Sequence, residues 1–191
     1  MLTKHRIINH TLEVVAVLIA IFGVIGFLIP QNDADYLILV QVPLIWLIRL
    51  LNTKYAWGFT ETHFSIGMFF LYAHIFGDNF FNFYYTIIIY DKILHSIIPL
   101  ILTYILAGSK LIKEKYFLTI FIVMGILGIF EISEYVIDQI SSAILQGVMI
   151  TQRQVEFMSP HTDTMTDMAL GLISSIIGYF AFLIKKHLKK N

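Results

Sequence analysis

An apolar stretch that ends in acidic residues, Tyr116 to Ile140, limits the folds open to this chain more than any other segment. The stretch is long enough to cross a bilayer as a helix, which needs about 20 residues. Its last part carries Glu131, Glu134 and Asp138, whose spacing of i, i+3 and i+7 places them on one helical face. Each ionised group at membrane depth costs about 2.5–3.5 kcal/mol. The three carboxylates therefore need partner groups, a metal ion or water.

Composition extends this conclusion to the whole chain. Apolar residues make up 58% of the sequence, mean hydropathy is +0.78, and charged residues make up 14%, against about 25% in soluble proteins. The chain is therefore predicted to be an all-α, polytopic protein of the cell membrane, with residues 1–191 forming a single integral membrane domain. The near-zero net charge, without a basic stripe, argues against a nucleic-acid partner. Because cysteine is absent, any metal site must use histidine and carboxylates.

Six apolar segments are predicted to cross the bilayer as a helix bundle. Their approximate bounds are 10–29, 36–51, 62–76, 86–107, 116–140 and 163–184. Pro43 should kink the second segment, and Pro99 lies inside the fourth.

Lysine and arginine are distributed unevenly between the two ends of these segments. One set of flanks holds Lys4, Arg6, Arg49, Lys54, Lys110, Lys113, Lys115, Lys185, Lys186, Lys189 and Lys190. The opposite set holds Lys92 and Arg153. Because positively charged flanks stay in the cytoplasm, the N-terminus and the C-terminus are both predicted to be cytoplasmic.

This topology brings ionisable residues from three segments to the outer end of the bundle. Asp91 and His95, at i and i+4, open the fourth segment, and Asp163 and Asp167 open the sixth with the same spacing. The three carboxylates of the fifth segment close it at that end. Pairs at i and i+4 present two side chains on one helix face, as in bundles that build metal and acid/base sites.

Other residues support a shared site at this end. Small residues that would allow close approach of the fifth and sixth helices are Gly125, Gly128, Gly171, Ser174, Ser175 and Gly178. His74 and His161 fall at the same end. The segment Ser141 to Thr162 is the one sizeable outer loop and is expected to cover what lies beneath it.

Each element also has a structural interpretation. The carboxylates of the fifth segment could pair with Lys92, Arg153 or hydroxyl groups as links between helices. Asp163 could be the N-cap of the sixth helix, with Asp167 in its first turn. A single buried histidine is more often hydrogen-bonded in the interior than a ligand. Three polar residues toward the cytoplasmic ends are interpreted as structural: Glu13, Glu61 and His63.

Three motifs in order carry a resemblance to a known family. They are Tyr90-Asp91-Lys92-x-x-His95, Glu131-x-x-Glu134-Tyr135-x-x-Asp138-Gln139 and Asp163-Thr164-x-x-Asp167-Met168. Together they resemble the bacterial YjdF-type inner-membrane proteins and, more distantly, the VanZ-like family, over roughly His63 to Gly178. The resemblance implies a small multi-helix membrane protein with the site at these motifs, and it implies no particular activity.

The leading hypothesis is a site within the membrane that opens to the outer face and binds a divalent cation. Its ligands would be Asp91, His95, Glu131, Glu134, Asp138, Asp163 and Asp167. A sulfur-free set of this kind suits Zn, Mn, Fe or Mg. The site would bind or act on a lipid-linked or cell-envelope substrate in the lipid bilayer, with Glu131 or Glu134 as general base.

Two other hypotheses use the same residues. In a proton-coupled transporter the carboxylates and histidines would relay protons or bind a cation, which requires polar residues in both halves of the membrane. In a structural membrane protein the acidic cluster would link helices and bind nothing.

Overall fold

The computed structural model of this chain describes Val14 and residues 36–75, 83–87, 89–112, 115–140, 148–150 and 155–189. Contacts divide it into two compact units, Met1–Phe81 and Asn82–Asn191, each described by itself. The predicted first span, 10–29, lies outside the described residues apart from Val14.

The first unit contains helices α2 (Tyr36–Tyr55) and α3 (Glu61–Ile75), which contact each other. The side-chain amide of Asn52 closes the turn between them, because it donates to the Phe59 carbonyl and accepts from the Phe59 N–H, both at 3.0 Å. Gly58 in this turn has a φ of 86°, a conformation that glycine adopts without strain. The helices predicted over 36–51 and 62–76 are therefore present.

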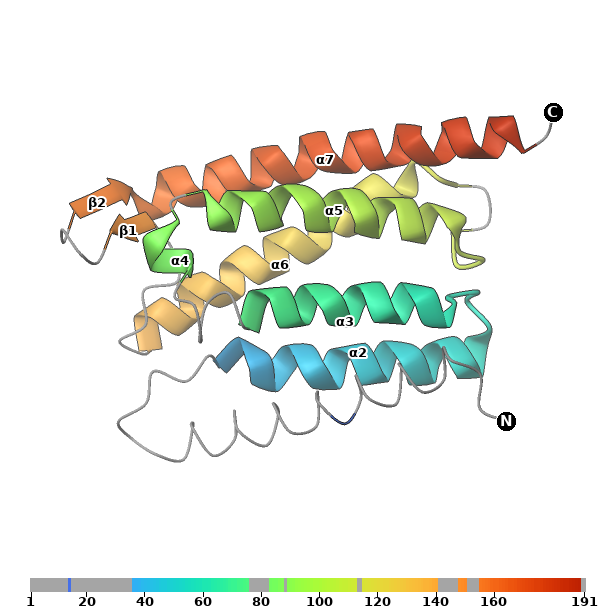
Figure 1. The fold of residues 1–191 in the computed structure, drawn as a ribbon, viewed down its shortest axis with the longest axis horizontal. Helices are drawn as coiled ribbons and strands as arrows, with labels where there is room; N and C mark the ends of the chain where they lie inside the picture. Colours follow the sequence, from blue (N-terminus) through green and yellow to red (C-terminus); the bar gives the residue numbers. More distant parts are fainter. Residues whose placement is uncertain are drawn as a thin grey trace. The chain divides into compact units, whose positions relative to one another are not determined.

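The second unit is built on three long helices (Figure 1): α5 (Tyr90–Gly108), α6 (Leu118–Ile140) and α7 (Pro160–Leu188). Helix α7 packs along α5 over much of its length, and α6 contacts both. The chain enters α5 and α7 at the same end of this unit and leaves α6 there. The predicted convergence of these three helix ends is therefore present.

The segment predicted to be an outer loop, 141–162, contains regular structure. Strands β1 (Val148–Ile150) and β2 (Val155–Met158) pair antiparallel, and the short helix α4 (Phe83–Thr86) contacts β1. The all-α prediction therefore missed a two-stranded ribbon. Both strands are rich in β-branched or aromatic residues, a composition that favours strands but is weak evidence in a stretch this short.

Among the described residues, three helices are long and apolar enough to cross a membrane. These are α5, α6 (as Leu118–Gln139) and α7. Helix α3, with 15 residues, is shorter than the roughly 20 that span a hydrocarbon core. The prediction of a helical protein with membrane-spanning helices is confirmed, and the full set of six spans stays a prediction.

In the second unit, large apolar side chains lie on the outside, and polar side chains are buried inside together with apolar ones such as Val123 and Leu127. On α6, Ile129 and Ile132 are 68% and 64% exposed, whereas the hydroxyls of Thr103 on α5 and Ser175 on α7 are fully buried. A soluble helix would bury its apolar face instead. The outer surface of these helices therefore suits contact with lipid chains.

Glycines on α7 let it approach its neighbours closely. A methyl group added at Gly178 would lie 2.3 Å from the Leu100 carbonyl oxygen, so the α5 and α7 backbones nearly touch there. Gly171 lies against the side chain of Leu127 on α6. The prediction was wrong for Gly125, which has nothing within 4 Å of its added methyl group. Apolar periodicity alone does not distinguish a glycine that faces a helix from one that faces outward.

Candidate functional site

The Lys92 ammonium group lies at the centre of the acidic cluster, between α5 and α7. It donates to Asp91 Oδ2 at 2.9 Å and to Asp167 Oδ2 at 2.6 Å, and it also donates to Asp163 Oδ1. An ammonium group has three N–H donors, so each donor is matched to one carboxylate. Lys92 therefore links the first turn of α5 to two successive turns of α7.

His95 extends the cluster from α5 to α6. Its Nε2 lies 3.4 Å from Asp91 Oδ1, and its Nδ1 lies 3.7 Å from Glu131 Oε1. The ring also packs near Phe130, with 6.0 Å between the ring centroids. The Nδ1 distance is longer than a hydrogen bond, so that nitrogen has no hydrogen-bond partner among the described residues.

Asp91 and Asp167 contact Lys92 through Oδ2, so the Oδ1 atom of each can contact another group. Asp91 Oδ1 faces His95, and Asp167 Oδ1 is buried with no hydrogen-bond partner among the residues that the structure describes. The side chain of Asp167 is only 2% exposed, so it has little contact with bulk solvent. A buried oxygen in this state costs free energy unless a ligand, ion or water binds it.

Asp91, His95 and Asp167 can hold one ion together. Each offers a ligand atom, and these three atoms lie within 4.8 Å of one another. Metal–ligand bonds of about 2.0–2.4 Å allow opposite ligands to be about 4–5 Å apart, so small side-chain movements suffice. One nitrogen and two carboxylate oxygens suit Zn, Mn or Fe, and Mg with more oxygen ligands.

The cluster carries more negative than positive charge. Besides the three aspartates that contact Lys92, two glutamates of α6, Glu131 and Glu134, are buried. Five ionised carboxylates against one ammonium leave an excess of four negative charges if His95 is neutral. Burying such an excess costs several kcal/mol per uncompensated ion. Protons or a further cation must therefore balance it.

The structure does not place every predicted site residue in the acidic cluster. Four of the predicted ligands are not part of the metal-compatible set found among the described residues: Glu131, Glu134, Asp138 and Asp163. Asp138 is half-buried, one helical turn beyond Glu134. His74 lies in α3, in the other unit, and its side chain is outside the described residues, as is all of Arg153. His161, predicted in a loop, lies in the first turn of α7 and is exposed.

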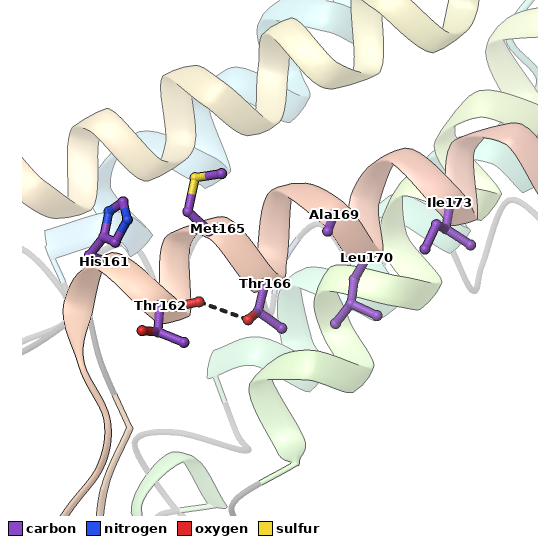
Figure 2. Close-up of a pocket in the computed structure, with 7 residues that line it drawn as sticks. All are labelled: His161, Thr162, Met165, Thr166, Ala169, Leu170 and Ile173. Carbon is purple, nitrogen blue, oxygen red and sulfur yellow. Dashed lines mark hydrogen bonds between the residues drawn. The ribbon is translucent and has the colours of Figure 1, made fainter.

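Exposed residues on α7 line a groove that is separate from the cluster (Figure 2). It has a volume of about 410 Å³ and is lined by His161, Thr162, Met165, Thr166, Ala169, Leu170 and Ile173. Thr166 donates to the Thr162 carbonyl at 2.7 Å, which satisfies its hydroxyl within the helix. Asp163 and Asp167 are buried instead of lining it. This groove is therefore not the candidate site.

The structure tests two of the structural interpretations, those of Asp163 and Glu61. Asp163 is not the N-cap of α7, because Ser159 caps it through the Thr162 N–H, and Asp163 is buried against Lys92. Glu61 is exposed and forms an ion pair with Arg49 at 2.9 Å, as expected of a structural residue.

The central role of Lys92 was missed by sequence reasoning, which treated it as one of several possible pairing partners. The available signal was its isolation, since it is one of two basic residues on its side of the predicted bundle. Thr164 belongs to the third motif but was given no role, and its side chain hydrogen-bonds with Glu131. A hydroxyl one residue from a motif acid gives no distinguishing sequence signal.

Comparison with known proteins gives one match. A family model described as "Predicted membrane protein (DUF2238)" matches residues 11–187. No curated protein and no solved structure matches the chain. The match covers all three cluster-bearing helices.

Proposed function

This chain belongs to the DUF2238 family of predicted membrane proteins, and from that premise we propose that it is a membrane protein with a buried divalent-cation site. Asp91, His95 and Asp167 are the proposed ligands, with Glu131 next to His95. The observation that carries the proposal is the pair of buried atoms, His95 Nδ1 and Asp167 Oδ1, which have no hydrogen-bond partner among the described residues. Both belong to side chains that can share one ion.

The proposed substrate is lipid-linked or part of the cell envelope. The site lies within helices whose outer surfaces are apolar, so a substrate reaches it from the bilayer or from the membrane surface. A bound divalent ion would polarise a phosphoryl or acyl oxygen or activate water. Glu131 and Glu134 are the proposed general bases, because both are buried on the α6 face that carries the cluster.

The membrane arrangement is proposed as six spans, in one domain over residues 1–191, with both termini in the cytoplasm. The uneven distribution of lysine and arginine supports this arrangement. It places the start of α5, the end of α6 and the start of α7 at the outer side of the cell membrane. The likeness to YjdF-type and VanZ-like proteins belongs to the same proposal.

A proton-coupled transporter is the second candidate. One observation favours it: the buried hydroxyls of Thr103 and Ser175, deeper in the helices, have no hydrogen-bond partner among the described residues, and water could bind there. Among the described residues, however, the predicted cytoplasmic half contains no buried acid. Glu61 is exposed and paired with Arg49, and Glu13 is outside the described residues. The cation site therefore has more support.

Metal content tests the proposal directly. We expect the purified wild-type protein to retain close to one equivalent of a divalent metal per chain, measured by elemental analysis after dialysis. Asp167→Asn keeps the shape of the side chain but removes a charged ligand, so we expect at least a tenfold loss of affinity. Glu134→Gln removes a buried charge near the ligands and should weaken binding less.

The matched control is Glu61→Gln, which removes an exposed carboxylate outside the site. It should bind metal as the wild type does. Thermal unfolding of each variant identifies losses caused by misfolding. If neither the wild type nor the control holds any divalent metal after loading, the cation site is refuted.

A further inference from the structure

The opposite end of the second unit carries a concentration of positive charge. The sequence there contains Lys110, Lys113, Lys115, Lys185, Lys186, Lys189 and Lys190, with Glu114 as the one acidic residue in stretches 110–115 and 185–191. The described lysines follow α5, precede α6 and end α7, so three helix ends share the charge. Clusters of this kind beside spanning helices attract anionic headgroups.

A second groove, of about 330 Å³, opens between the start of α6 and the C-terminal half of α7. It is lined by Lys115, Tyr116, Phe117, Leu118, Phe121 and Tyr179. Aromatic rings form a continuous wall of this groove. The centroid of the Phe117 ring lies 5.2 Å from that of Phe121 and 6.2 Å from that of Tyr179. The groove therefore combines an apolar wall with a cation at one end.

A second cation lies next to Tyr116, which lines the groove and carries a hydroxyl. Lys186 donates to the Tyr116 hydroxyl oxygen at 2.5 Å and lies 4.2 Å from the centroid of its ring. Because the lysine donates in this contact, the Tyr116 O–H remains able to donate to another acceptor. Lys115 is exposed and also lines the groove. Ammonium groups and an O–H donor are the kinds of group that bind the oxygens of a phosphate diester.

We propose that this groove binds an anionic phospholipid, with its phosphate at Lys115, Lys186 and Tyr116 and an acyl chain along Phe117 and Phe121. The groove has a cationic end and an exposed aromatic wall, and the wall favours an apolar occupant. This combination supports a lipid over a free phosphate ion. The site lies at the end of the helices away from the acidic cluster, so it does not depend on the proposed cation site. Tyrosine and lysine at this position are also typical of the membrane interface.

Lipid retention by the full-length protein tests this site. The protein in a neutral detergent is mixed with equal amounts of phosphatidylglycerol and phosphatidylcholine, and bound lipids are counted by native mass spectrometry. We expect wild type to retain phosphatidylglycerol preferentially. Each charge-assisted contact with the phosphate contributes about tenfold in affinity, so the double substitution of Lys115→Gln and Lys186→Gln should lower retention at least tenfold.

The matched control is the double substitution of Lys110→Gln and Lys189→Gln, which removes the same charge at the same end but outside the groove. It should change retention less than threefold. Phe121→Ala should weaken phosphatidylglycerol binding, whereas glycerol phosphate, which lacks acyl chains, should not compete at equal concentration. Equal losses in the two lysine pairs, equal retention of the two lipids, or full competition by glycerol phosphate would each overturn the proposal.

Discussion

Replacing Lys92 with methionine is expected to lower the free energy of unfolding by about 3–5 kcal/mol, the usual cost of removing one partner from a buried ion pair. Methionine has nearly the shape of lysine without its charge. Three carboxylates lose a hydrogen-bond donor at once, and Asp163 and Asp167 are almost completely buried. The change also removes the polar link between α5 and α7. Unfolding of the purified protein in mixed micelles, followed by circular dichroism, measures the effect.

Lys110→Met is the matched control, since Lys110 is exposed and follows α5 at its other end. It should change the unfolding free energy by less than about 0.5 kcal/mol, as surface substitutions do. Adding a divalent cation should stabilise Lys92→Met more than the wild type, because the freed Oδ2 atoms of Asp91 and Asp167 join the ligand set. A Lys92→Met protein as stable as the control would mean that protons already neutralise the cluster.

The convergence of acidic residues could be predicted from the sequence because it depends on two robust signals. Apolar length gives the helices, and alternating direction puts the start of α5, the end of α6 and the start of α7 at one end. Spacing at i and i+4 then gives the shared face of Asp163 and Asp167, which both contact Lys92. These inferences need only chain direction and helical period.

The internal geometry of the cluster could not be predicted in the same way. Which oxygen of Asp167 faces Lys92 and which stays without a partner depends on how far α7 is rotated and shifted along α5. The close approach of Gly178 to Leu100 constrains that position, and apolar periodicity does not encode this contact. The start of α7 at Pro160 instead of Asp163 has a similar origin, since Ser159 provides a cap that sequence reasoning had assigned to Asp163.

Alanine at Gly178 is expected to destabilise the second unit by about 1–3 kcal/mol, as overpacking of a close interface does. The added methyl group would lie 2.3 Å from the Leu100 carbonyl oxygen and 3.1 Å from its carbonyl carbon. These are backbone atoms within α5, so they cannot rotate away, and the two helices must separate. Separation would also lengthen the contacts of Lys92 with α7.

Gly171→Ala provides a control on the same helix. Its methyl group would also meet an atom at 2.3 Å, but that atom is the Leu127 Cδ1 at the end of a flexible side chain. Both substitutions gain the same helix propensity, about 1 kcal/mol, so this term cancels when the two variants are compared. In the same detergent, the Gly178→Ala variant should therefore unfold at a lower temperature than the Gly171→Ala variant. The reverse order would show that α5 and α7 are not held at backbone contact, and that another part of the interface sets the position of Asp167 relative to Lys92.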